Sequence, residues 1–128
     1  MKYLLLSYTP IAEWDSSDAE MPSPEALEAF AIYEKFRAEL SASGELVATE
    51  GLGHPSVSRT LRKQTDAVVV TDGPFAELKE VLASYAVIDC SGYDRAVEIA
   101  RRVVEAIGDT VEIRPIMGAD FTESAAQT

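Results

Sequence analysis

The sequence predicts an α+β fold of the ferredoxin-like, split-βαβ type with an inserted β-hairpin. Two segments of strand–helix–strand character follow one another along the chain, and a pair of β-prone runs lies between them. The 128 residues contain no long linker-like stretch, so the chain is long enough to form one domain around a hydrophobic core. We therefore expect a single domain over residues 1–117 and a small, polar tail over residues 118–128.

The first strand–helix–strand unit lies in the N-terminal part of the chain. Residues 2–8 are a largely apolar β-type run, and residues 11–23 are expected to form a loop. A long helix then begins with Ser23 as its N-cap, Gly44 supplies its stop, and residues 45–49 form the second strand. The apolar residues of this helix recur at helical spacing and are expected to face the core or a dimer partner: Leu27, Phe30, Tyr33, Phe36 and Leu40.

The inserted hairpin precedes the second unit. Its strands are expected over residues 57–63 and 67–71, joined by three residues. The second unit begins with a strand over residues 82–89 and closes with a strand over residues 110–114. The helix between them is expected to start at a capping box, to stop at Gly108 and to bury one apolar stripe. The capping box is Ser91 with Asp94, and the stripe is Val97, Ala100, Val103, Val104 and Ile107.

A ferredoxin-like arrangement places both helices on one face of the sheet, and the opposite face then needs a cover. A small domain with a bare apolar face commonly pairs with a second copy of itself. We therefore expect a homodimer.

Charge and composition disfavour several classes of function. The net charge of −11 opposes nucleic-acid phosphates and anionic membrane surfaces, so we expect no direct nucleic-acid or membrane partner. No apolar run is long enough to span a bilayer. Cys90 is the only cysteine, which fits a cytoplasmic protein, and we interpret it as a buried packing residue. One histidine and one cysteine do not make a structural zinc site, and the sequence has no phosphate-binding loop or dinucleotide fingerprint, so we expect no metal and no cofactor.

The segment Asp72–Glu80 (DGPFAELKE) is the strongest candidate for a functional site. It breaks the most β-prone run of the chain, because Gly73 and Pro74 force a turn, and it places ionisable groups just beyond a strand end. Asp72 and His54, the only histidine, are the candidate acid–base pair, since an imidazole titrates near neutral pH. The alternative is that Asp72 caps its own turn and that His54 is a surface loop residue.

Further residues near this turn are candidates for substrate binding. Arg59 and Arg62 belong to the only local basic cluster and are expected either to attract a small anionic ligand or to keep a hairpin edge solvated. Lys79 is expected either to bind a carboxylate or to join an ion-pair network with its acidic neighbours. The remaining candidates are Glu50, Phe75, Glu77, Glu80 and Trp14, the last of which either caps a pocket or packs on the core.

The turn segment resembles the motif of the DGPF branch of the YCII-related protein family. The start of the chain (MKYLLL), the Gly51 loop and the closing segment Val111–Met117 are also similar to the family pattern, so the resemblance covers nearly the whole chain. It implies a dimeric α+β barrel, in which two ferredoxin-like sheets enclose a cleft. It also implies lyase or muconolactone-isomerase-like chemistry for some relatives, and a connection with extracytoplasmic-function sigma factors. The resemblance further implies an acid–base pair of an aspartate and a histidine near the first helix, but residues 23–29 contain no histidine, so that pair is not carried over.

Two hypotheses for function follow. The first is a cofactor-independent lyase or isomerase that performs acid–base chemistry on a small, carboxylated molecule, with Asp72 and His54 as its pair. The second is a non-catalytic dimeric module that binds a small molecule or a protein, linked to sigma-factor regulation.

Overall fold

A computed structural model describes residues 1–16 and 23–118. Most of the tail expected over residues 118–128 therefore lies outside the described residues. None of the described helices is both long and apolar enough to cross a membrane. The elements in chain order are β1 (Lys2–Pro10), α1 (Ile11–Ser16), α2 (Pro24–Ser43), β2 (Leu46–Gly51), the 3-10 turn η2 (Pro55–Val57), β3 (Arg59–Gln64), β4 (Ala67–Asp72), β5 (Glu80–Asp89), α3 (Tyr93–Ile107) and β6 (Thr110–Pro115).

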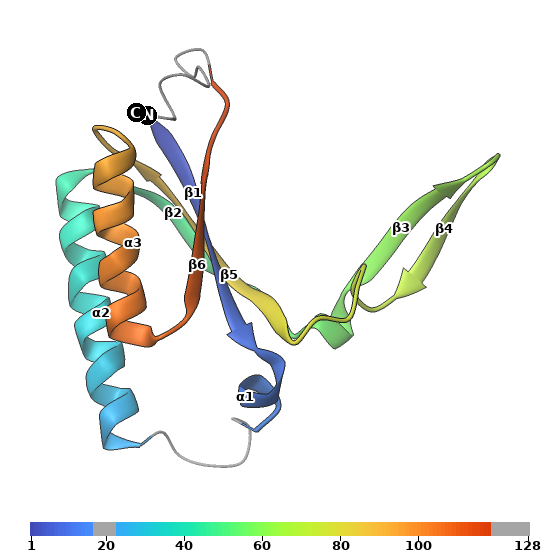
Figure 1. Ribbon diagram of the computed structural model, residues 1–128, viewed down its shortest axis with the longest axis horizontal. Coiled ribbons are helices and arrows are strands. Elements are labelled where there is room, and N and C mark those ends of the chain that lie inside the picture. Colours follow the sequence, from blue (N-terminus) through green and yellow to red (C-terminus); the bar gives the residue numbers. More distant parts are fainter. Residues whose placement is uncertain (17–22, 119–128) are drawn as a thin grey trace.

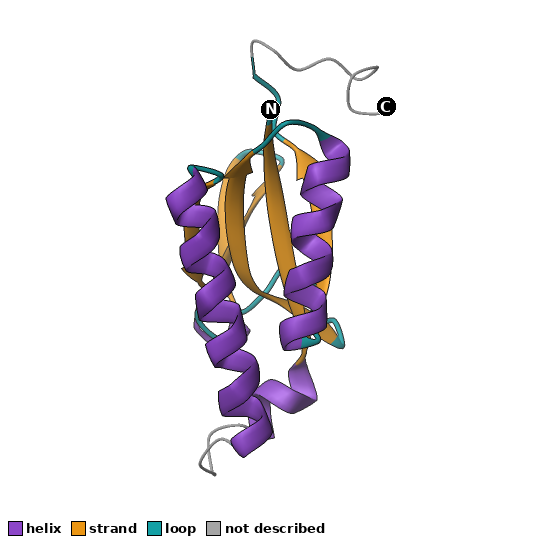
Figure 2. Ribbon diagram, turned by 90° about the vertical axis from the view of Figure 1, so that its left-hand side faces the viewer, coloured by secondary structure: helices purple, strands orange, loops and turns teal. Residues whose placement is uncertain are grey.

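The main sheet has the strand order β2-β5-β1-β6, and all of its neighbouring strands are antiparallel. Helices α2 and α3 lie side by side on one face of this sheet (Figures 1 and 2). This is the split-βαβ arrangement, so the predicted ferredoxin-like fold is confirmed. The strands β3 and β4 form a separate two-stranded sheet that projects away from the sandwich (Figure 1).

The hydrophobic core is concentrated at one end of the helix–sheet sandwich, which we call the closed end. Here Arg95 of α3 forms a bidentate ion pair with Glu45, through Nε to Oε2 and Nη2 to Oε1, both at 2.8 Å. Cys90 is buried at this end as predicted, and burial raises the pKa of its thiol. The buried residues are Tyr3, Leu5, Phe36, Leu40, Ile88, Cys90, Ala96, Ile99 and Ala100.

Helix α2 begins and ends where the sequence indicates. The Ser23 hydroxyl accepts a hydrogen bond from the Ala26 amide at 3.1 Å, and Gly44 ends the helix with φ of 81°. Its apolar stripe is only partly in the core, however, because the first turns of α2 extend past the end of α3 (Figure 2). Leu27 and Phe30 are consequently 57% and 59% exposed, whereas Phe36 and Leu40 are buried.

Three sequence-based predictions about the helices need correction. Part of the loop expected over residues 11–23 is the short helix α1, whose first amide, that of Ile11, donates to the Lys79 carbonyl at 2.7 Å. The capping box is absent, since Gly92 is the N-cap of α3 and makes no side-chain cap bond. The buried face of α3 overlaps the predicted stripe at Ala100, with Val103 packed against the core, but Ala96 and Ile99 take the other buried positions. That face is Ala96, Ile99 and Ala100, while Val97, Val104 and Ile107 are exposed.

Element boundaries elsewhere differ from the prediction by a few residues. Strand β5 begins at Glu80 and not at residue 82, and β3 begins at Arg59 because Pro55–Val57 form a 3-10 turn. Ile88 is buried while Asp89 is exposed, because successive side chains of a strand point to opposite faces of the sheet.

Candidate functional site

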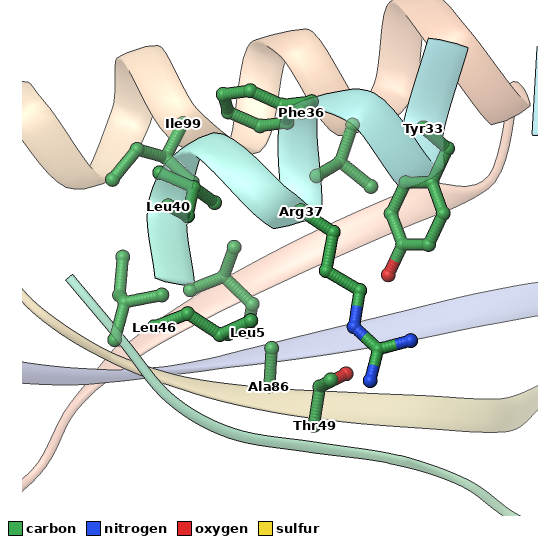
Figure 3. Close-up of a pocket in the computed structure, with 11 residues that line it drawn as sticks. Leu5, Tyr33, Phe36, Arg37, Leu40, Leu46, Thr49, Ala86 and Ile99 are labelled. Atoms are coloured by element: carbon green, nitrogen blue, oxygen red, sulfur yellow. The ribbon is translucent and has the colours of Figure 1, made fainter. Parts of the chain in front are cut away.

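A cleft of about 400 Å³ opens at the end of the sandwich opposite the core, which we call the open end. Its walls come from the middle of α2, the C-terminal part of α3 and the strands β1, β2 and β5. A smaller, mainly apolar cavity of about 30 Å³ lies beside it toward the core, and the two share Tyr33, Arg37, Thr49 and Val103 (Figure 3). The cleft is lined by Ser7, Phe30, Tyr33, Glu34, Arg37, Thr49, Glu50, Gly51, Ser84, Val103, Ile107 and Asp109.

The floor of the cleft is polar. On β1 and β5 the residues that face the helices are apolar near the closed end, and they are serines at the cleft. On β1 the residues of this face run Tyr3, Leu5, Ser7, and on β5 they run from Ile88 to Ser84. Ser7 and Ser84 are direct partners in the β1–β5 register. The sheet face thus changes from apolar at the closed end to hydrogen-bonding at the open end.

Asp109 is a partly buried acid that lines the cleft. It directly follows Gly108, whose φ of 85° ends α3, and its carboxylate accepts a hydrogen bond from the Thr9 hydroxyl at 3.2 Å. Burial raises the pKa of Asp109, the Thr9 hydrogen bond lowers it, and the negative charges of Glu13 and Glu80 raise it further. The result is a raised pKa, which moves this carboxyl toward the range where a side chain can both give and take a proton.

Arg37 and Tyr33 supply the polar groups of the opposite wall. Figure 3 shows the Arg37 side chain extending from α2 toward the sheet and ending above Thr49, with the Tyr33 hydroxyl pointing the same way. The Arg37 guanidinium lies 3.6 Å from a carboxylate oxygen of Glu34 and is 45% exposed. Its planar donors suit bidentate binding of a carboxylate.

The residues of the predicted turn site fall into two groups. Asp72 is 92% exposed, and its carboxylate lies 3.7 Å from Nε of Arg59, its partner across the hairpin. Lys79 borders a shallow hollow of about 470 Å³ that Glu80 also lines, and Glu80 belongs to the second group as well. Within the described part of the chain, no ion pair joins Lys79 to Glu77 or Glu80, so the predicted ion-pair network is absent.

The second group lies around a hollow of about 500 Å³ at the base of the hairpin. It is lined by His54, Phe75 and Glu80, but not by Asp72, Glu77 or Lys79. The Nδ1 atom of His54 lies 2.9 Å from the Ser56 hydroxyl, and the Trp14 ring meets the His54 ring edge-on at 5.5 Å between centroids.

Arg62 has a structural role at the same place. Its Nη2 atom donates to the Phe75 carbonyl at 3.2 Å, and its guanidinium lies 4.7 Å from the centre of the Phe75 ring. Together with the Gly73 amide, which donates to the Ser58 carbonyl at 2.8 Å, these contacts hold the turn against the base of the hairpin.

Among the predicted candidates, only Glu50 lines the cleft at the open end. Sequence reasoning missed Asp109, Arg37 and the Tyr33 hydroxyl as site residues. The sequence did carry a signal for this cleft. Ser7 and Ser84 stand at positions where the alternation of each strand would otherwise place an apolar residue. Among the described residues, no three side chains of His, Cys, Asp or Glu come together as a group that could hold a metal ion.

Comparison with known proteins places the chain in a family. A model of the YCII-related domain matches residues 1–121. An uncharacterized protein of Rhizobium meliloti (strain 1021) is 37% identical over 76 residues, a region that covers 58% of this chain and 61% of that relative. Because the family model matches almost the whole sequence, the chain belongs to the family of YCII-related domain proteins.

Proposed function

We propose that this protein is a cofactor-independent lyase or isomerase that moves a proton on a small, carboxylated molecule bound in the cleft at the open end. The observation that carries the proposal is Asp109, a partly buried carboxyl with a raised pKa in a cleft that Arg37 also lines. Asp109 takes up and returns the proton, Arg37 binds the carboxylate of the substrate, and the hydroxyls of Ser7 and Ser84 orient it.

The difference in exposure between Asp109 and Asp72 favours the cleft over the turn segment as the site of proton transfer. A general acid or base works best where water is excluded, and Asp72 is 92% exposed on the hairpin. The alternative acid–base pair is Asp72 with His54, and Arg59, Arg62 or Lys79 would then bind the anion. The variant Asp72→Asn tests this alternative.

A homodimer through the open sheet face is part of the proposal. The face opposite the helices carries Leu4, Leu6, Tyr85 and Val87, which lie on neighbouring strands in register and are only partly buried within one chain. Packing two such faces together removes this apolar surface from water and forms a dimeric α+β barrel.

The test is a thermal-shift screen of small carboxylic acids, including malonate, maleate and oxaloacetate. We expect a stabilising acid to shift the Tm of the wild type and of Asp72→Asn equally, and to lose its effect in Arg37→Gln. Arg101→Gln, on the exposed side of α3, is the matched control. A shift that survives Arg37→Gln and is lost in Asp72→Asn would move the site to the turn.

Turnover is tested separately on each acid that binds. Proton exchange with deuterated water, followed by NMR, is expected for the wild type and is expected to fall by about 100-fold or more in Asp109→Asn. Binding without exchange in the wild type would favour the non-catalytic, ligand-binding module instead.

A further inference from the structure

The β3–β4 hairpin, residues 59–72, forms an arm that pairs only with itself and projects from the body of the molecule (Figure 1). Its two faces differ, as the register shows. Thr60 and Arg62 are on the face that holds the base turn, since the Thr60 hydroxyl donates to the Gly73 carbonyl at 2.9 Å and Arg62 binds Phe75. The other face has no such contact with the body among the described residues.

This second face of the arm is apolar with basic edges. Leu61 lies opposite Val70, and Lys63 lies opposite Val68. Leu61, Val68 and Val70 are 62%, 62% and 55% exposed, although a strand residue facing a core would be covered. Arg59 completes the same face, where it lies opposite Asp72 with its Nε 3.7 Å from that carboxylate, so the face carries two basic groups and one acidic group.

An isolated two-stranded hairpin is at best marginally stable in water, so an arm of this kind needs a surface to pack on. Its own body is not that surface, because the arm points away from it (Figure 1). The arm holds three of the chain's eleven basic residues but only two of its twenty-two acidic ones, so it is a basic projection on a strongly acidic body. Such an arm is complementary in charge to the body of another copy and repels another arm.

We propose that the arm clasps the body of a second copy of the chain. The face of Leu61, Val68 and Val70 packs on that copy, and Arg59 and Lys63 pair with its acidic groups. The inference rests on the homodimer proposed above and adds a second contact to it.

Dimer dissociation measured by sedimentation equilibrium tests the proposal. We expect the double variant Arg59→Glu/Lys63→Glu to weaken dimerisation by about tenfold or more, with the difference from the wild type shrinking at high salt. The control is Lys35→Glu/Arg101→Glu, which makes the same change in net charge on the helix layer, and we expect it to weaken the dimer far less. Equal weakening by the two double variants, or a wild type that stays monomeric, would overturn the proposal.

A second measurement does not depend on how the charge variants fold. A photo-crosslinking residue at position 61, in a mixture of isotopically light and heavy chains, is expected to give light–heavy crosslinks outside residues 59–72. Crosslinks confined to one chain or to two arms would refute the clasp. A dimer that forms without arm–body crosslinks would refute the clasp but not the homodimer through the sheet face. Loss of dimerisation in Leu6→Arg, with no effect of the arm variants, would show that the sheet face alone holds the dimer.

Discussion

Replacing Glu45 by Gln should remove a pH-dependent part of the stability of the fold. Glu45 precedes β2 and Arg95 lies in the first half of α3, so their ion pair ties the helix layer to the sheet at the closed end. The side chains are only 19% and 28% exposed, and Ser43 donates a third hydrogen bond to Oε1 of Glu45 at 3.0 Å. Gln keeps the size of the side chain but loses the charge.

The pKa of Glu45 gives the magnitude. The hydrogen bonds from Arg95 lower it from an ordinary 4.5 to about 2. At about 1.36 kcal/mol per pKa unit this fall corresponds to about 3 kcal/mol. Water still reaches part of the pair, so we expect about 2 kcal/mol in practice.

The sign follows from the depressed pKa of the folded state. The stabilisation is fully present above pH 4.5, the ordinary pKa, and is lost as the pH falls toward about 2. Urea unfolding at pH 7 should therefore show Glu45→Gln to be about 2 kcal/mol less stable than the wild type. The difference should shrink steadily below pH 4.5.

The control is Glu105→Gln, a loss of the same charge on the exposed side of α3. We expect its stability to stay within about 0.5 kcal/mol of the wild type at every pH. Parallel pH profiles for the wild type and Glu45→Gln would refute the reasoning, because the pair would then contribute no linked stability.

Two further predictions concern the open end and the turn. Because the folded pKa of Asp109 is raised, the wild type should lose stability as the pH rises above the ordinary aspartate range, and Asp109→Asn should lack this loss while its amide oxygen still accepts from Thr9. Urea unfolding between pH 3 and pH 8 checks this, and an unchanged slope in the variant would contradict it. Gly73→Ala should cost about 1 kcal/mol, since φ there is 98° and the added methyl has no other atom within 4 Å. Gly51→Ala, equally open but without positive φ, is the control in the same unfolding assay, and an equal cost would refute backbone strain as the cause.

Local signals along the chain were sufficient to predict the fold. The long α2 helix follows from Ser23 and Gly44, whose capping roles depend on a few neighbouring residues. The order of strands and helices allows few topologies, and the ferredoxin-like one is confirmed. The buried face of α3 was harder to predict, because apolar residues surround much of the helix, and the fold buries Ala96, Ile99 and Ala100 but leaves Val97 and Val104 exposed.

The site could not be predicted in the same way, because it depends on tertiary placement. Asp109 is an ordinary loop acid in the sequence, and it becomes partly buried only because α3 ends beside Thr9 of β1. Arg37 likewise reads as part of a solvated helix face, although its side chain turns toward the sheet (Figure 3). Asp72, which has the more conspicuous sequence setting, extends into solvent on the arm.

The groups that stabilise the fold and the proposed binding site lie at opposite ends of the sandwich. The buried core and the Glu45–Arg95 pair hold α2, α3 and the sheet together at the closed end, so the helices need not meet the sheet at the open end. The gap left there is the cleft, and it carries polar groups that a core would not tolerate without partners. Glu45→Gln should accordingly lower the Tm but preserve the shift that a bound carboxylic acid produces. Arg37→Gln should instead leave the Tm of the free protein nearly unchanged and abolish that shift. A single variant that abolished both would show that the two ends are coupled, and the cleft would then have to be treated as part of the core.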